Sequence, residues 1–389
     1  MRRVHRLLTA SLAVSLIGLA PTAGATLSAA TPKVKAIYAA PGPYAAGVTT
    51  VTIGDRQAEV WYPIAKKSAH GKHKDVYEIV KWLPQGLQDL VASKGIKAPF
   101  TTNAYRNVKV SKRGPFPMVI FAHGFGSYRD QSTFLTTHLA SWGFVVPSPD
   151  FLERGLGAQL GAAPAVSRTE ADVIDSTIAT VRAASARKHG VLSGSVAPHA
   201  EIAITGHSAG GRTAITYGAH RNVITYIPLA GAAAAFRQSP AATPPRGKSS
   251  LYIAGATDGV VATDGIKTFY RTVPAPKRLV VIDRVGHLNA MSDICEIGKG
   301  GGGVVALAQQ AGLPVPETLA RLGTDGCFKP AYRSTKVWPI TRHFEVAQLR
   351  YAFGINKAPI GLGPSIVKAF APVTVTYSIT RATHHQKKR

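Results

Sequence analysis

Short apolar runs alternate with longer amphipathic stretches between residues 117 and 282. The runs are bounded by glycine, proline or polar residues, as in strands buried on both faces, at 117–122, 144–147, 202–205, 223–228, 251–254 and 279–282. Helical spacing of apolar positions fills intervals between them, at 131–142, 170–188 and 209–220. This alternation predicts an α/β fold, with a mostly parallel central sheet and helices on both of its faces.

The flanking segments are less regular. They predict a β-hairpin at 48–63, helices at 76–98, 304–322 and 341–353, and a strand at 373–379. Together with the central pattern, they predict one α/β domain over residues 26–380. The basic residues at 381–389 are expected to form a frayed C-terminal tail.

The first 25 residues have the pattern of a signal peptide. Arg2, Arg3 and Arg6 precede the apolar stretch 7–20, and Ala23-Gly24-Ala25 offers a small-x-small cleavage site. The stretch is short for a membrane span. The pattern predicts a secreted, extracellular protein, with an N-terminal anchor that stays attached as the alternative.

Cys295 and Cys327 are the only cysteines. Outside the cytoplasm an even count favours a disulfide, and closing a loop of this length contributes about 3–4 kcal/mol of stability. The alternative is two buried free thiols. Two cysteines without a nearby histidine pair lack the ligands of a zinc site, so no metal is predicted.

The formal net charge of +26 raises the question of an acidic partner. The basic residues are scattered, and their densest runs, 66–67, 70–74 and 387–389, are in loop-like or terminal stretches. No zinc-finger spacing or RNP-type aromatic pattern accompanies them, so specific nucleic-acid binding is not predicted. Adhesion to an anionic cell-envelope surface is the favoured interpretation, and plain solubility is the alternative.

The strongest chemical signal is Gly206-His207-Ser208-Ala209-Gly210. This GxSxG pattern follows an apolar strand and opens a helix, as in the tight strand-to-helix turn that exposes the nucleophile of α/β-hydrolases. Glycine is needed there because strand and helix approach closely around a strained serine. We therefore predict the α/β-hydrolase fold with Ser208 as the nucleophile.

A serine hydroxyl needs a base, and in this fold the acid and then the histidine follow the nucleophile along the chain. Asp258 follows the predicted strand 251–254 within a turn-forming segment and is the favoured acid, with nearby Asp264 as its rival. His287 comes just after the strand 279–282 and is the favoured base among 13 histidines. The acid would hold the imidazole in the required tautomer.

An oxyanion hole is expected from the segment Phe121-Ala122-His123-Gly124-Phe125-Gly126. It follows the first central strand, upstream of the serine, where the second donor of such a site is expected. The backbone N–H groups of Phe125 and Ala209 would then point at the developing alkoxide. An ordinary glycine-rich turn is the alternative.

The stretch 117–151, PMVIFAHGFGSYRDQSTFLTTHLASWGFVVPSPDF, with VWYP at 60–63, resembles a known group. It is similar to secreted, cutinase-like polyester hydrolases, and to platelet-activating-factor acetylhydrolases and dienelactone-hydrolase-like proteins. The resemblance covers residues 60–287 and implies the same roles for Phe125, Ala209, Asp258 and His287. Two departures concern the substrate: 228–236 lacks the tryptophan of polyester hydrolases, and the nucleophile is serine rather than the cysteine of dienelactone hydrolases.

Residues 289–337 are interpreted as an insertion tethered by the two cysteines, forming a wall or lid over the pocket. The predicted function is hydrolysis of a small-molecule or lipid-like carboxylic ester through an acyl-enzyme, without a cofactor. The alternatives are an acyltransferase or peptidase of the same fold and a non-catalytic cell-envelope binding protein that kept the hydrolase sheet.

Overall fold

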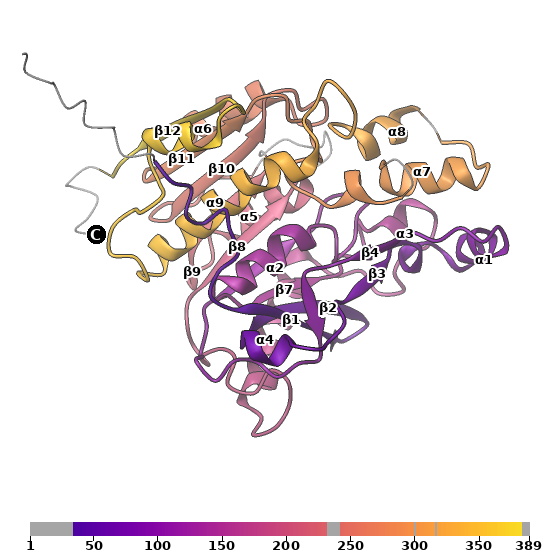
Figure 1. Ribbon diagram of the computed structural model, residues 1–389, viewed down its shortest axis with the longest axis horizontal. Helices are drawn as coiled ribbons and strands as arrows, with labels where there is room; N and C mark the ends of the chain where they lie inside the picture. The colour runs from indigo at the N-terminus through magenta and orange to yellow at the C-terminus, as the bar shows by residue number, and fades with distance from the viewer. Residues whose placement is uncertain (1–33, 232–241, 299–300, 316, 383–389) are drawn as a thin grey trace, which may run out of the picture. The chain divides into compact units, whose positions relative to one another are not determined.

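A computed structural model of the chain describes residues 34–231, 242–298, 301–315 and 317–382 (Figure 1). These residues belong to one compact unit that begins at Val34. The predicted signal peptide at 1–25 and most of the predicted tail at 381–389 lie outside the described residues.

Six strands form the main part of the central sheet, in the order β12-β11-β10-β9-β8-β6. Neighbours from β6 to β11 run parallel, and only β12 is antiparallel to its partner, β11. The strands are β6 (Met118–Ala122), β8 (Ile202–His207), β9 (Val223–Leu229), β10 (Ser249–Gly255), β11 (Lys277–Ile282) and β12 (Val375–Thr380). The predicted mostly parallel sheet is therefore confirmed.

Four further strands continue the sheet on the outer side of β6. Their order is β5-β1-β2-β7, with β7 nearest to β6 and β5 at the outer edge. They are β1 (Ala45–Ile53), β2 (Arg56–Ile64), β5 (Ala104–Arg106) and β7 (Val146–Pro149). Val145 joins the two parts: its carbonyl accepts from the N–H of Val119 and its N–H donates to the carbonyl of Pro117, both at 2.9 Å. The predicted hairpin at 48–63 is the β1–β2 pair.

Helices cover both faces of the sheet, which accounts for the continuous apolar runs of its strands. Along β6, Met118 and Ile120 belong to one hydrophobic cluster, with α4 (Glu170–Ala186), α5 (Ala209–Tyr217) and α6 (Thr263–Thr272). Val119 and Phe121 belong to the other, with α2 (Thr133–Ser141) and α9 (Ser334–Ala352). Alternate strand residues thus enter opposite halves of the core.

The segment 76–98 differs from its prediction as a single helix. It forms β3 (Val76–Glu78), which pairs with β4 (Pro99–Thr101), then the 3-10 helix η2 (Ile79–Trp82) and finally α1 (Gln85–Ser93). Pro84 stands at the N-cap of α1 in an extended conformation. The helix begins after it because proline cannot donate the hydrogen bond that a helix interior requires.

The segment 304–322 also differs, since it forms two helices rather than one. They are α7 (Gly303–Gln310) and α8 (Glu317–Thr324), and Gly312 between them has a φ of +70°. Pro314 follows, so the connection cannot continue the helix of α7. The remaining short elements are α3 (Leu156–Gln159), η1 (Lys66–Ala69), η3 (Ile294–Glu296) and η4 (Pro364–Phe370).

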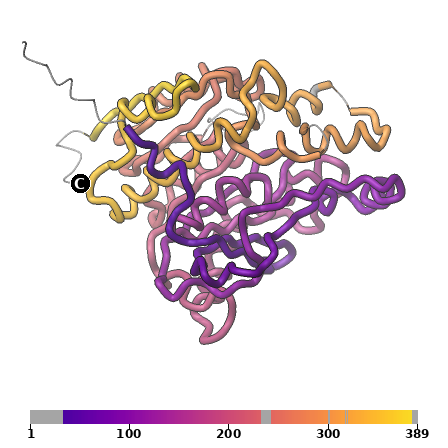
Figure 2. Tube along the Cα trace, in the orientation of Figure 1, coloured from indigo at the N-terminus to yellow at the C-terminus, as the bar shows by residue number. Residues whose placement is uncertain are grey.

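The segment that leads into β1 runs beside the C-terminal third of the chain (Figure 2). The backbone N–H of Tyr38 donates to Nδ1 of His343 on α9 at 3.3 Å, and Asn356 donates to the Tyr38 hydroxyl at 2.6 Å. His343 on α9 therefore helps to hold the segment before β1 against the C-terminal part of the chain.

Candidate active site

Ser208 lies in the tight turn between β8 and α5. Its backbone has φ +57° and ψ −118°, a strained conformation for a residue with a side chain. A Cβ at Gly206 or Gly210 would collide with the carbonyl of Ala122 at the end of β6. The two glycines of the motif therefore let β8, α5 and β6 meet closely enough to form the turn.

His287 and Asp258 form a buried pair at the carboxyl ends of β11 and β10. The His287 Nδ1 atom and the Asp258 Oδ2 atom are 2.9 Å apart, and the two residues are 1% and 7% exposed. The other carboxylate oxygen of Asp258 accepts from the backbone N–H groups of Val260 and Val261. Because the carboxylate accepts the proton of Nδ1, the Nε2 lone pair of His287 is left to act as a base.

Asp264, the rival acid, is placed elsewhere. It lies in the first turn of α6, where its side chain is 91% exposed and pairs with Lys267 at 3.1 Å. Asp258, by contrast, is the carboxylate in contact with His287. The geometry thus favours Asp258 as the predicted acid.

The loop after β6 lies directly against the serine. A Cβ at Gly124 would be 3.3 Å from the Cβ of Ser208. Phe125, the next residue, lines the same pocket as Ser208. Ala209 is the first residue of α5, where backbone N–H groups have no partner within the helix. Both predicted oxyanion donors are thus close to the serine.

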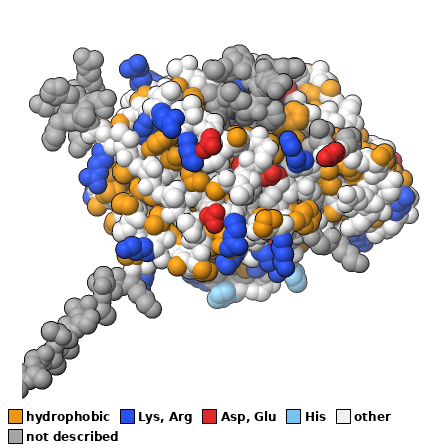
Figure 3. All heavy atoms as spheres, turned by 90° about the horizontal axis from the view of Figure 1, so that it is seen from above, with side chains coloured by type: hydrophobic (Ala, Val, Ile, Leu, Met, Phe, Trp, Pro, Cys, Tyr) orange, Lys and Arg blue, Asp and Glu red, His pale blue; other side chains and the backbone are white. Residues whose placement is uncertain are grey.

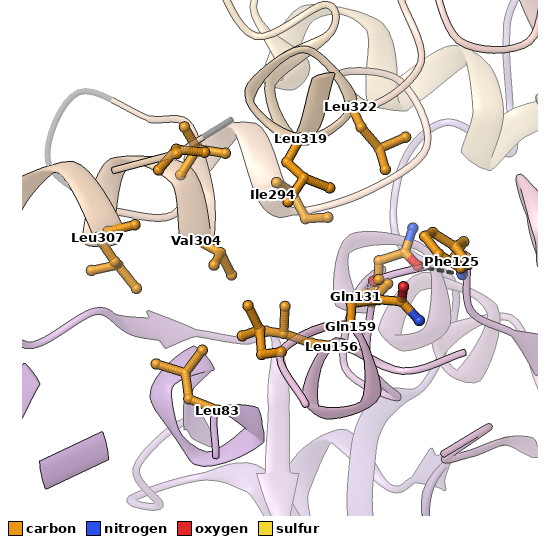
Figure 4. Close-up of a pocket in the computed structure, with 18 of the residues that line it drawn as sticks. Leu83, Phe125, Gln131, Leu156, Gln159, Ile294, Val304, Leu307, Leu319 and Leu322 are labelled. Carbon is orange, nitrogen blue, oxygen red and sulfur yellow. Dashed lines mark hydrogen bonds between the residues drawn. The ribbon is translucent and has the colours of Figure 1, made fainter. Parts of the chain in front are cut away.

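Ser208 and His287 line one pocket with a volume of about 410 Å³. Figure 4 shows part of the lining of this pocket. Its walls come from α1, α3, α7, α8 and the loop after β6. The walls are mainly apolar, as for Leu156 of α3, Leu307 of α7 and Leu319 of α8. The segment 289–337, predicted as a wall or lid, therefore contributes two helices to the pocket.

Two family models match parts of the chain. The model described as chlorophyllase matches residues 101–232, and the model described as platelet-activating factor acetylhydrolase, isoform II, matches residues 30–158. Neither reaches half of the chain. A solved structure of a ferulic acid esterase from Streptomyces cinnamoneus is similar with a TM-score of 0.52 and 18% identity, covering 87% of this chain and 98% of that one. No curated protein matches the chain in sequence.

The chain has the α/β-hydrolase fold. The similarity to the platelet-activating-factor acetylhydrolase group, predicted from the residues around 117–151, is confirmed by the second family model. The two family models, described as chlorophyllase and as an acetylhydrolase, together with the fold of a ferulic acid esterase, support an ester hydrolase in general terms. The matched ranges include Ser208 and Phe125, whereas Asp258 and His287 lie beyond both.

A buried hydrogen-bond chain, not predicted from the sequence, links three loops of this hydrolase. Gly124 donates its backbone N–H to Oε1 of Gln131 at 2.8 Å, and Gln131 Nε2 is 2.5 Å from Nδ1 of His207. The His207 Nε2 atom is 2.8 Å from the carbonyl of His287. Since an amide N–H can only donate, His207 accepts at Nδ1 and donates from Nε2, as a neutral imidazole.

The environment of His207 keeps it neutral. Burial lowers the pKa of His207 well below its ordinary value, and nearby His287 lowers it further. The two rings are 4.6 Å apart between centroids. A neutral His207 therefore places no second positive charge beside His287 when that residue takes up a proton. The sequence shows His207 only as a residue of the GxSxG motif, and nothing in it indicates this contact.

A second contact that the sequence did not predict joins the segment 289–337 to the loops that carry Asp258 and His287. Asp325, just after α8, accepts from the backbone N–H of His287 at 2.5 Å and from that of Gly259 at 3.2 Å. A Cβ at Gly286 or Gly259 would collide with this carboxylate. One side chain thus holds the loop of Asp258 against the loop of His287.

The predicted disulfide between Cys295 and Cys327 is present, with Cα atoms 4.8 Å apart. It closes the insertion between η3 and the residues after α8. Within the described ranges, no group of three or more His, Cys, Asp or Glu side chains is arranged to hold a metal ion. None of the helices in those ranges has the length and apolar character needed to cross a bilayer.

The basic side chains are spread out on the one face of the surface that Figure 3 draws. On the face drawn in Figure 3, Lys and Arg side chains lie among apolar and neutral ones rather than in one patch. This distribution agrees with the scattered charge of the sequence. Adhesion to an anionic cell envelope stays a prediction.

The segment 228–236, in which the sequence lacks the tryptophan of polyester hydrolases, is only partly described. Residues 232–241, which include most of the alanine run after β9, lie outside the described residues.

Proposed function

We propose that this chain is a secreted serine hydrolase that cleaves carboxylic esters through an acyl-enzyme. Ser208 is the nucleophile, His287 the general base and acid, and Asp258 the residue that orients His287. The observation that carries the proposal is the position of strained Ser208 in one pocket with a buried His287–Asp258 pair. The family models and the esterase fold support the same class of reaction.

In the proposed reaction, His287 Nε2 takes the proton of the Ser208 hydroxyl as its oxygen attacks the ester carbonyl. The negative charge on the former carbonyl oxygen is stabilised by the backbone N–H groups of Phe125 and Ala209, each worth several kcal/mol in known hydrolases. His287 then protonates the leaving alcohol. Water, deprotonated by the same nitrogen, releases the acid and restores Ser208.

Asp258 orients His287 throughout the proposed cycle. It accepts from Nδ1 of His287 and from two backbone N–H groups, which stabilise its negative charge. When His287 becomes an imidazolium, this fixed charge stabilises it without any rearrangement. The Asp325 carboxylate keeps the two loops together while this happens.

The test compares the mature protein with Ser208→Ala on p-nitrophenyl acetate and butyrate, together with labelling by a fluorophosphonate. We expect turnover and labelling in the wild type and loss of both in the variant. Asp264→Asn is the matched control for Asp258→Asn, and only the latter should reduce kcat strongly. A folded wild-type protein that neither turns over these esters nor takes the label would exclude the proposal and favour a non-catalytic binding protein.

Export is the other part of the proposal. The Arg-rich start, the apolar stretch and the disulfide support cleavage after Ala25. The mass of the protein recovered from the medium of an expressing culture tests this: it should correspond to a chain that begins at Thr26. Recovery of the intact chain in the cell membrane fraction would instead support the retained anchor.

A further inference from the structure

The pocket is far larger than an acetyl group requires. Its volume of about 410 Å³ lies in the range of sites that enclose drug-sized ligands. The polar side chains of its lining are Ser127, Gln131, Gln159, His207, Ser208 and His287, and Figure 4 shows Gln131 and Gln159 beside each other. Away from the serine the lining is apolar, so the pocket offers a reactive end and a long hydrophobic part (Figure 4).

The hydrophobic part is a sleeve between two helical layers. One layer contributes Leu83 and Leu87, next to and within α1, and Leu156 of α3. The opposite layer, which we call the roof, consists of the described residues of 303–324 and contributes Leu307, Leu319 and Leu322. In Figure 4 the labelled side chains of both layers point into the space between them.

Two apolar side chains of the sleeve are exposed rather than packed in the core. Leu160, after α3, is 36% exposed and Leu319, on α8, is 42% exposed, and both line the pocket. Exposing leucine to water is unfavourable, so an apolar ligand that covers these two side chains gains the free energy of their burial. Their position indicates where the bound chain lies.

The lining also restricts the charge of the ligand. No Lys, Arg, Asp or Glu side chain is among the described residues that line the pocket. A charged group placed in the sleeve would lose its hydration without gaining a partner, at a large cost in free energy. The sleeve therefore fits a neutral aliphatic chain and excludes a charged head group.

The residues on either side of the roof are bonded to the rest of the protein. Asp293, which precedes η3, accepts from the backbone N–H groups of Thr133 and Phe134 at the start of α2. At the other end of the roof, Asp325 binds the His287 loop and Cys327 is bonded to Cys295. Both ends of the segment that carries the roof are thus anchored, which limits the conformational entropy that this segment loses when a chain binds.

We propose that the sleeve binds the aliphatic chain of a neutral ester, with the ester carbon at Ser208 and the chain between α1, α3 and the roof. The proposal rests on the proposed ester hydrolysis. The chain can belong to the acid or to the alcohol, because both are attached to the reacting ester. Either way, kcat/KM rises with chain length for as long as added methylenes are buried.

Burying one methylene strengthens binding about fourfold. If that gain is kept in the transition state, kcat/KM rises by about this factor per carbon until the sleeve is full. Two series of substrates test this: p-nitrophenyl esters from acetate to decanoate vary the acid, and alkyl butyrates from ethyl to decyl vary the alcohol. All are used below the concentration at which they form micelles.

Leu160→Gln/Leu319→Gln is the variant that tests the sleeve. Both side chains are partly exposed, so the change leaves the buried core intact. The matched control is Ile355→Gln/Ile360→Gln, which replaces side chains that are 42% and 48% exposed and do not line the pocket. Each variant is reported as the ratio of octanoate to acetate kcat/KM, so that changes common to all esters cancel.

We expect a rise with chain length in at least one series, a clearly lower octanoate-to-acetate ratio in the sleeve variant and an unchanged ratio in the control. Flat series, with acetate still hydrolysed by Ser208, would overturn the aliphatic-chain proposal while leaving the proposed function in place. A wild-type ratio in the sleeve variant would overturn it as well. Absence of all turnover and of fluorophosphonate labelling would instead mean that the proposed function is wrong.

Discussion

Glu345 is a buried acid that the structure favours in its protonated form. It lies on α9 and is fully buried against the sheet, with Oε1 2.7 Å from Oγ1 of Thr205 on β8. The Thr205 hydroxyl is also 2.9 Å from the carbonyl of Ile227 and has only one proton to donate. A protonated Glu345 donates to Thr205, which then donates to Ile227, so that both contacts are satisfied.

The other oxygen of Glu345, Oε2, has no hydrogen-bond partner among the described residues. An ionised carboxylate at this position would therefore be buried with no donor to this oxygen. Burial raises the pKa of Glu345 from its ordinary value of 4.5 to about 8. Two observations, the shared hydroxyl proton and the desolvation, thus lead to the same protonation state.

The consequence is a loss of stability with rising pH. Because the pKa is raised in the folded state, the contribution of Glu345 is fully present below pH 4.5 and is lost as the pH rises to about 8. Each unit of pKa difference corresponds to 1.36 kcal/mol, so the full loss is about 5 kcal/mol. Glu345→Gln has nearly the same shape and cannot ionise. Its free energy of unfolding, relative to the wild type, should increase by about this amount between pH 4 and pH 9.

Urea denaturation of both proteins at intervals from pH 4.5 to 9 measures this difference. Other buried groups, such as Asp293, whose pKa is raised to about 7 by burial, titrate in both proteins and cancel when the two curves are subtracted. A difference that rises by more than about 1 kcal/mol per pH unit between pH 5 and 8 would agree with a neutral Glu345. A flat difference, or one that falls with pH, would refute it.

Three further predictions concern the contacts around the proposed triad. Asp325→Ala should lower kcat about 10- to 100-fold at nearly constant KM, because the loop of His287 loses its anchor, and Asp325→Asn should restore part of kcat by keeping one acceptor. Gln131→Leu should reduce kcat about tenfold, since His207 loses the donor that fixes its tautomer and with it the hydrogen bond to the carbonyl of His287. Cys295→Ser should lower the free energy of unfolding by about 3–4 kcal/mol, and wild-type protein in reductant should show the same loss in urea denaturation.

The residues of the proposed triad could be brought together by prediction because their positions depend on local patterns. Each follows an apolar run that became a central strand, and parallel strands bring their carboxyl ends to one edge of the sheet. The glycines beside Ser208 marked the close approach of β8 and α5. The choice between Asp258 and Asp264 needed the structure, since both lie in similar Ala-Thr-Asp-Gly segments and only the start of α6 separates them.

Other parts of the site left no signal of this kind. Gln131 and Asp325 act through partners 76 and 38 residues away, and nothing in their immediate sequence marks such contacts. The division of the predicted helix 304–322 into α7 and α8 follows from local glycine and proline. These two helices lie across the pocket from α1. That arrangement depends on tertiary packing, which the spacing of apolar residues along the chain cannot specify.

The way the roof is attached separates two kinds of effect that substitutions in it should have. Asp325, the residue directly after the roof, binds the loops of His287 and Asp258 through its carboxylate. A change there displaces the proposed base and should lower the rate by a similar factor for short and long esters. A change in the middle of the roof, as at Leu319, alters only the wall beyond the reacting ester and should change the ratio between them. Asp325→Ala could instead change the octanoate-to-acetate ratio as much as Leu160→Gln/Leu319→Gln does. Asp325 would then act by shaping the wall of the pocket, and its proposed role in positioning His287 would be wrong.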